Sequence, residues 1–294
     1  MKKYTMFLAL FMAVATIAWT GQTVNESRPI ASDAEVWVEN LAGSLVFEGW
    51  DRSVLEVTGT LGDGVERLDI DSDEDGISIE VVFDEDYHGR QIDPTDLTIR
   101  LPRGVSLEVE TVSASISVSG LLGELDFESV SGNIRVDGTP GDLDAESVSG
   151  DVIVAMAPDG ADLATVSGTI QIAAVSGAFD AENVSGNIVI EGDRLYGADL
   201  ETVSGNIECH ALPGPSGDID AETMSGTITL YVDADAPAYY ELSTFSGKIA
   251  NDIGPEASRT SKYTPGKELS FNTGSGGPRI SIESFSGAIK LLTK

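Results

Sequence analysis

Cysteine, histidine and basic residues are scarce in this sequence. It has one cysteine, Cys209, and two histidines, His88 and His210. A single cysteine excludes an intramolecular disulfide framework and a cysteine-rich zinc site, and two histidines leave little material for a histidine-based metal site. Lys and Arg number 17 against 49 Asp and Glu, which gives a formal net charge of -32. Because such a charge repels phosphate backbones, we expect no nucleic-acid partner.

Long hydrophobic runs are absent except at the N-terminus. Lys2 and Lys3 precede an apolar run that ends at Ala18. This pattern predicts a secretory signal peptide over residues 1–18, with cleavage as late as residue 21 as a variant and an uncleaved membrane anchor as the alternative. No later segment reaches the ~18 apolar residues of a membrane-spanning helix. We therefore expect an exported mature chain without a transmembrane segment, in the periplasm or on the surface of a bacterium.

An internal repeat occupies most of the remaining sequence. Its clearest copies are ESVSGNIRVDG, ESVSGDVIVAM, ATVSGTIQIAA, ENVSGNIVIEG, ETVSGNIECHA and ETMSGTITLYV, and earlier copies are ENLAGSLVFEG and ETVSASISVSG, where Ala114 replaces the glycine. The repeat glycines are Gly132, Gly150, Gly168, Gly186, Gly205, Gly226, Gly247 and Gly287. Successive glycines are 18, 18, 18, 19, 21, 21 and 40 residues apart. Such a period is typical of a stack of structural repeats.

Each period contains two strand signals. Leu125 and Phe127 alternate with acidic residues before the glycine, and Ile134 and Val136 alternate with polar residues after it. Period-2 alternation places one face in the core and the other in solvent. The parity changes around the glycine, so we expect a corner there that uses glycine's backbone freedom. The sequence therefore predicts an all-β fold: a single-stranded parallel β-helix or closely related β-solenoid, right-handed, with 18 residues per coil.

These motifs also resemble a known family. The VSGNI repeat, the segment WVENLAGSLVFEGW at 37–50 and the segment LTIRLPRGVSLEVETVSASISV at 97–118 are similar to the bacterial putative-adhesin family of β-strand-repeat envelope domains. The resemblance extends over residues 33–294. It implies an envelope-associated or adhesin-like role, and it supplies no catalytic motif, since fold alone does not fix function.

The chain divides by composition into five segments. After the signal peptide we expect a polar, mobile leader at 19–32, N-terminal coils and a cap at 33–110, and the regular repeats at 111–250. An irregular insertion and a C-terminal capping coil follow at 251–294. Residues 104–247 hold 25 acidic and 2 basic residues, whereas residues 248–294 carry a formal charge of +3. An acidic rod with a basic end is compatible with head-to-tail self-association.

Carboxylates form the main candidate binding feature. Stacked repeats would align one outward column of aspartates and an adjacent column of glutamates: Asp126, Asp144, Asp162, Asp180, Asp199 and Asp220, then Glu128, Glu146, Glu182, Glu201 and Glu222. Such columns attract counterions, including calcium, or serve as a solvated face that prevents sideways pairing. Asp71, Asp73 and Asp75 begin a calcium-loop-like motif, but Val82 stands where its last ligand should be, which favours an acidic turn. We therefore expect no cofactor, with calcium as the alternative.

No residues form a recognisable catalytic constellation. The serine of each VSG repeats throughout the chain, which favours a corner ladder over a nucleophile. His88 and His210 are expected on the surface, and Cys209 takes the place of a core aliphatic residue. Our leading hypothesis is an exported, non-enzymatic scaffold or binding module whose partner is an unidentified envelope or surface component. The alternatives are a calcium-stabilised acidic binding protein and a glycan-active β-helix enzyme.

Overall fold

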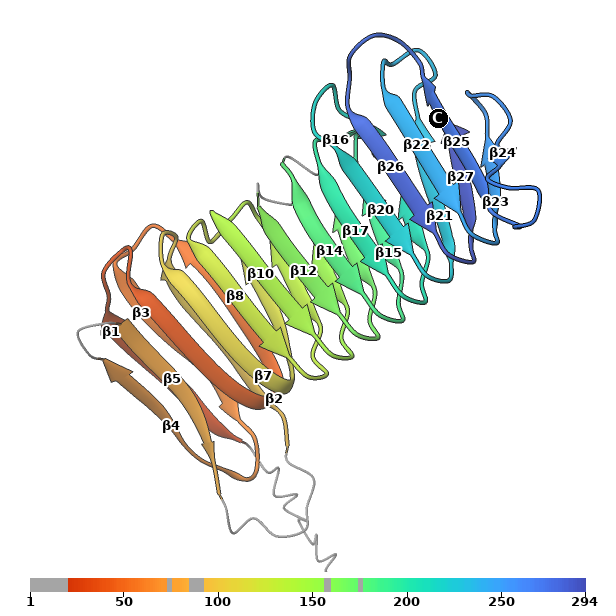
Figure 1. Ribbon diagram of the computed structural model, residues 1–294. Coiled ribbons are helices and arrows are strands. Elements are labelled where there is room, and N and C mark those ends of the chain that lie inside the picture. The colour runs from red at the N-terminus through yellow and green to blue at the C-terminus, as the bar shows by residue number, and fades with distance from the viewer. Residues whose placement is uncertain (1–20, 73–75, 85–92, 156–159, 174–176) are drawn as a thin grey trace, which may run out of the picture.

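The computed structural model describes residues 21–72, 76–84, 93–155, 160–173 and 177–294. The predicted signal peptide, residues 73–75 and His88 lie outside these residues. Within the described ranges all regular secondary structure is β, and the strands form one elongated stack (Figure 1). The all-β, solenoid-like fold class is thereby confirmed.

The middle of the stack has two parallel faces. The first face contains β8 (Glu124–Ser129), β10 (Asp142–Ser147), β12 (Ala161–Thr165), β14 (Phe179–Asn183), β17 (Ala198–Thr202) and β20 (Ile219–Thr223). The second contains β9 (Ile134–Asp137), β11 (Val152–Val154), β13 (Ile170–Ala173), β15 (Ile188–Glu191), β18 (Ile207–Cys209) and β21 (Thr227–Val232). Each strand pairs in parallel with its equivalent in the next repeat, so equivalent residues lie side by side.

The core lies between the two faces. Leu125 and Phe127 point inward from the first face, and Ile134 and Val136 point inward from the second. These inward positions are buried in every repeat, as the alternation predicts, because each strand turns its apolar side to the other face. Cys209 occupies one of them and is 2% exposed.

The N-terminal end is less regular. The long strands β2 (Glu35–Trp50) and β7 (Ser106–Ser119) contribute to both faces and pair with each other in parallel. The other edge of β2 pairs with β5 (Gly76–Phe83) and β6 (Thr95–Pro102). Three antiparallel strands complete this end: β1 (Gln22–Pro29), β3 (Val54–Leu61) and β4 (Val65–Ser72). The expectation of a mobile polar leader is therefore wrong for residues 22–29, because the backbone of β1 pairs with β3 throughout its length.

At the C-terminal end the order of layers differs from the order of the chain. β26 (Arg279–Ser284) and β27 (Ala288–Thr293) pair with β20 and β21. β22 (Tyr239–Thr244) and β23 (Lys248–Asn251), which come earlier in the chain, lie on the outer side of β26 and β27. Within the segment 251–294, β26 and β27 thus form an inner layer and not the capping coil that was expected at the end of the chain (Figure 1).

The outermost strands at this end are antiparallel. β25 (Lys267–Asn272) pairs with β22, and β24 (Ser258–Arg259) pairs with β25. Two short strands, β16 (Arg194–Leu195) and β19 (Leu212–Pro213), form a separate two-stranded sheet beside the stack. Antiparallel strands thus close both ends, where a parallel stack would expose unpaired edges.

Candidate functional site

A buried polar side chain lies at the end of each first-face strand, and in several layers it holds the turn between the two faces by hydrogen bonds. Ser147 accepts a hydrogen bond from the backbone N–H of Gly150 at 2.9 Å and donates one to the carbonyl oxygen of Gly132 in the preceding layer at 3.3 Å. Thr165 makes the same two contacts with Gly168 and Gly150, at 3.0 and 3.2 Å. The buried ladder is therefore formed by the residue two before the VSG serine, and the VSG serines themselves are exposed.

The repeat glycines are required by close packing between layers. A Cβ added to Gly168 would lie 1.9 Å from the carbonyl oxygen of Gly150, and one added to Gly150 would lie 1.9 Å from that of Gly132. The same contact recurs through all eight repeat glycines, and none of them has a positive φ. Glycine is thus explained by the approach of the neighbouring backbone, and the predicted need for unusual backbone angles does not apply.

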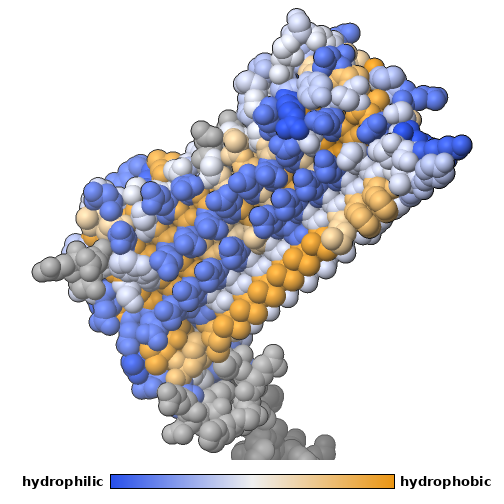
Figure 2. All heavy atoms as spheres, in the orientation of Figure 1, coloured by the Kyte–Doolittle hydropathy of each residue, from blue (hydrophilic) through white to orange (hydrophobic). Residues whose placement is uncertain are grey.

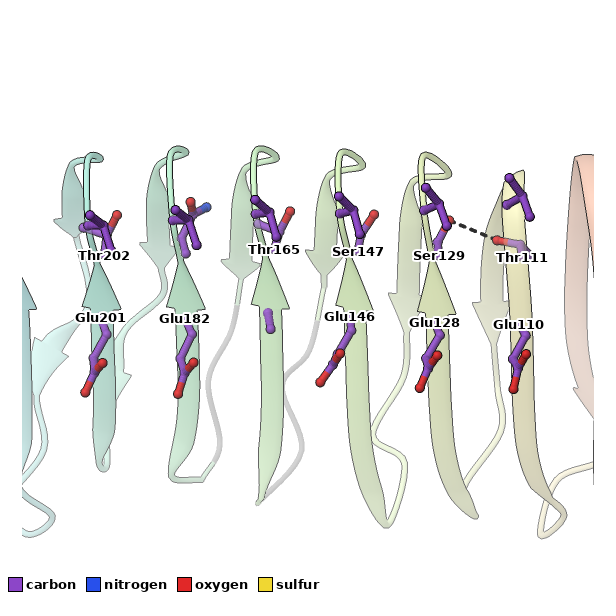
Figure 3. A pocket seen from close by; sticks show the side chains of 18 of the residues that line it. Glu110, Thr111, Glu128, Ser129, Glu146, Ser147, Thr165, Glu182, Glu201 and Thr202 are labelled. Atoms are coloured by element: carbon purple, nitrogen blue, oxygen red, sulfur yellow. Dashed lines mark hydrogen bonds between the residues drawn. The ribbon is translucent and has the colours of Figure 1, made fainter.

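Carboxylates align along the outer side of the first face. In stacking order the glutamate column consists of Glu80, Glu39, Glu110, Glu128, Glu146, Glu182, Glu201, Glu222 and Glu283, with Ala164 between Glu146 and Glu182. The aspartate column lies beside it, from Asp126 to Asp220. The structure thus aligns the two predicted columns and extends the glutamates at both ends. Figure 3 shows glutamates of successive strands pointing the same way.

The columns raise the pKa of several of their own carboxyl groups. Burial, and then the charges of Asp126, Glu146 and Asp162, raise the pKa of Asp144 to about 6. Burial followed by the charges of Glu110 and neighbouring carboxylates raises the pKa of Glu128, and Glu222 and Asp199 respond in the same direction. Like charges in adjacent strands disfavour ionisation, so a cationic partner would relieve a repulsion that already exists.

A row of exposed apolar side chains runs parallel to the glutamate column. We call it the apolar row; in stacking order it consists of Val112, Val130, Val148, Val166, Val184, Val203, Met224, Phe285 and Phe245. Their exposed fractions range from 42% to 58%. Val130 is two residues beyond Glu128, just past the end of β8, and its backbone N–H donates a hydrogen bond to the carbonyl oxygen of Thr111 at 3.2 Å. The row appears as a continuous orange line along the molecule in Figure 2.

The glutamate column and the apolar row border a shallow groove of about 1280 Å³. Its floor consists of the residues between each glutamate and each apolar side chain, such as Ser129 and Ser147 (Figure 3). At its C-terminal end the rings of Phe245 and Phe285 stack with their centroids 4.9 Å apart. The groove thus has one acidic wall and one apolar wall along most of the molecule.

The remaining predicted site residues lie elsewhere. Asp71 is an exposed residue near the end of β4, and Asp73 and Asp75 lie outside the described residues. Among the residues that the structure describes, no group of three or more His, Cys, Asp or Glu side chains is arranged to hold a metal ion. His210 stacks on Tyr231 with ring centroids 4.8 Å apart, and its Nε2 is 3.0 Å from Glu208. Burial raises the pKa of the Cys209 thiol to about 12, which makes it a poor nucleophile.

The apolar row was not predicted from the sequence, although the signal was present, because the valine of VSG lies next to the predicted parity change. Asp126, Glu128 and Val130 share one parity, however, and the outward position of the first two implies that Val130 is also outward. The sequence could not show that Phe285 lies between Met224 and Phe245, because this depends on the altered layer order.

Comparisons with known proteins identify the fold and the family. A structure from Parabacteroides merdae, described as a putative adhesin, aligns over 92% of this chain and 97% of its own, with 12% identity and a TM-score of 0.53. A Bacteroides fragilis structure described as a putative adhesin covers the same shares at 14% identity, with a TM-score of 0.48. A Parabacteroides distasonis structure described as a putative lipid binding protein does so at 15% identity, with a TM-score of 0.47.

No curated protein matches the chain. Within the described residues, no helix has the length and apolar character needed to cross a membrane. The Toastrack DUF4097 family model matches residues 66–292, which is most of the sequence, and the resemblance to an adhesin-like repeat family is thereby confirmed. This chain belongs to the Toastrack DUF4097 family.

Proposed function

We propose that this chain is an exported, non-enzymatic binding scaffold of the bacterial cell envelope, with an adhesin-like role. The observation that carries the proposal is the apolar row beside the glutamate column, which extends over nine layers of the stack. Soluble monomers rarely leave a long contiguous apolar strip exposed, and such strips mark interaction sites. The finer description of the fold, a right-handed solenoid with 18 residues per coil, is part of the same proposal.

The repetition in the groove favours binding over catalysis. A catalytic site needs different groups that converge on one reacting atom. In this groove the same glutamate, buried polar residue and apolar side chain recur from layer to layer. A repeated surface offers many equivalent contacts to an extended partner, as in other solenoid proteins. The adhesin description of the Parabacteroides merdae structure is consistent with this role.

Photo-crosslinking in the native organism tests the proposal. A photoreactive amino acid replaces Val148 in the apolar row, and a matched variant carries it at Leu122, which is exposed but lies outside the row. We expect the chain in the envelope fraction without residues 1–18, and adducts from position 148 that position 122 does not form. An intact chain in the cytoplasm, or equal adducts from both positions, would contradict the proposal.

A further inference from the structure

We infer that the groove binds a cationic amphipathic polypeptide segment whose apolar stripe packs on the apolar row and whose Lys or Arg side chains meet the glutamate column. This inference rests on the proposed binding function and specifies the chemistry of the partner. Three properties of the groove support it: its apolar content, its charge and its length.

The apolar row is a graded binding surface. Its first six members are valines, and its last three are Met224, Phe285 and Phe245, which expose 58%, 55% and 52% of their surface. The three large side chains offer a partner one broad apolar contact, and the six valines offer a long, narrow one. Aromatic residues and methionine are enriched in protein–protein interfaces, so the stacked Phe245–Phe285 pair is the expected anchor.

The negative charge of the glutamate column determines which apolar partners can bind along the row. One side of the row carries the glutamate column, and the other side carries exposed serines, such as Ser149 and Ser167. A partner therefore meets negative charge along one flank only. Burial, and then the charges of neighbouring carboxylates, raise the pKa of Glu128 and Glu222, so repulsion within the column contributes to both shifts. Lysine or arginine along the matching flank of a partner would remove this repulsion and make ion pairs beside a dehydrated apolar contact.

The same charges disfavour two other occupants. A second copy of the chain also carries a net charge of -32, so association through this face must overcome strong repulsion. An anionic lipid surface is repelled for the same reason. A basic polypeptide is attracted over the full length of the groove.

The length of the row suits a helical segment. The layers are about 4.8 Å apart, so the eight steps from Val112 to Phe245 span about 38 Å. A helix of about 25 residues has this length, and its pitch of about 5.4 Å brings roughly one apolar side chain per turn to each layer. An amphipathic helix with Lys or Arg along one border of its apolar stripe fits both walls of the groove.

The test measures binding of synthetic peptides to the full mature chain by fluorescence anisotropy. The probe is a helix of about 25 residues with a leucine stripe bordered on one side by lysine, at about 0.15 M salt to screen nonspecific attraction. One control peptide replaces lysine with glutamate, and a second has the same composition in shuffled order. We expect saturable binding of the probe and at least tenfold weaker binding of both controls.

Variants of the protein locate the binding site. We expect Val148→Ser/Val166→Ser/Val184→Ser to weaken the probe at least tenfold, whereas Leu122→Ser leaves it unchanged. Glu146→Gln/Glu182→Gln should weaken it severalfold, and Glu124→Gln/Glu191→Gln, which removes the same charge outside the groove, should have little effect. Circular dichroism melts verify that each variant is folded.

Each contrary outcome has a distinct meaning. Equal binding of the probe and the shuffled peptide, without an effect of the valine variants, would overturn the inference in favour of simple charge attraction. Dimers that dissociate in the valine variants would assign the row to a second copy and would also overturn it. Failure of the probe to bind, while position 148 still forms its specific photo-adducts, would overturn the peptide inference but leave the scaffold function standing. Loss of those adducts as well would remove both.

Discussion

The regular middle of the stack and its two ends follow different rules of assembly. Between β8 and β21, each layer pairs with the one that precedes it in the chain. At the ends, strands from different parts of the chain interleave. β2 lies between β7 on one edge and β5 and β6 on the other. The layer of β26 and β27 lies between the layer of β20 and β21 and the layer of β22 and β23. A repeat specifies how layers stack but not how a stack stops. The ends therefore need long-range pairing and antiparallel strands.

The two kinds of region also differ in charge. Near the N-terminal end Arg100 pairs with Glu48 at 2.8 Å, and near the C-terminal end Arg279 pairs with Glu241 at 2.9 Å. Residues 104–247, by contrast, hold 25 acidic residues and two basic ones. The middle is thus held by its buried core and polar ladder against the repulsion of its own carboxylates. Of the two ends, only the C-terminal one offsets its acidic charge: residues 248–294 carry a formal charge of +3, whereas residues 1–103 hold 20 acidic and 8 basic residues.

Removal of residues 279–294 should have the largest effect: it should destabilise the C-terminal end and leave the middle folded. It deletes an inner layer with four fully buried side chains, Ile280, Ile282, Ile289 and Leu291. Each contributes about 1.5–3 kcal/mol, and together they match much of the stability of a typical domain. We expect residues 233–278 to become sensitive to limited proteolysis, while the fragment up to β21 stays resistant. A truncated chain that is as protease-resistant as the intact one would show that the layer is dispensable.

Gly168→Ala should destabilise the middle strongly. The new Cβ would lie 1.9 Å from the carbonyl oxygen of Gly150, so the layers must separate locally. We expect a loss of more than about 3 kcal/mol in the free energy of unfolding, measured by chemical denaturation. The matched control is Gly141→Ala, whose nearest contact would be 3.3 Å and which should cost less than about 1 kcal/mol. Equal losses in both variants would rule out close layer packing as the reason for the repeat glycines.

Mild acidification should stabilise the middle. The pKa of Asp144 is about 6 in the folded chain, above its ordinary value of 3.8, so the folded state binds more protons between these values. The free energy of unfolding contributed by this group therefore falls as pH rises through about 6. We expect a higher melting temperature near pH 5 than near pH 7, and a weaker pH dependence in Asp144→Asn. A lower melting temperature near pH 5 would mean that other groups outweigh the column.

Added salt should produce the smallest and least specific effect. Screening reduces repulsion between exposed carboxylates, so the melting temperature should rise with sodium chloride. At matched ionic strength we expect calcium and magnesium to give equal shifts. A calcium-specific excess that Glu146→Gln/Glu182→Gln abolishes would instead support the calcium-stabilised alternative and place its sites in the glutamate column.

The sequence predicted the middle better than the ends for a physical reason. Equivalent residues such as Leu125 and Leu143 occupy equivalent environments, so alternation and period suffice to place them. The position of β26 depends on competition among several similar repeats for the exposed edge of β20, and local pattern does not decide it. The polar residues of 22–29 likewise gave no apolar signal, because β1 is held by backbone pairing with β3 and is largely exposed.

The candidate site was only half predictable. The carboxylate columns followed directly from the repeat, and the exposure of Val130 could have followed from the same parity. The continuity from Met224 through Phe285 to Phe245 required the spatial order of the layers. The role of Gly168 was misjudged because a sequence shows where a glycine recurs but not how near the next backbone lies.

The altered layer order has a consequence for how the protein acquires its structure. A stack that grows layer by layer from its N-terminal end reaches β21 and then lacks its next layer until residues 279–293 are available. Until then β22 and β23, which carry a similar motif and pair with β26 and β27 in the native fold, can compete for the free edges of β20 and β21. We therefore expect the C-terminal end to fold last, after residues 279–293 have been synthesised. An exported chain that emerges gradually from a membrane pore would complete it only after most of its length has already folded.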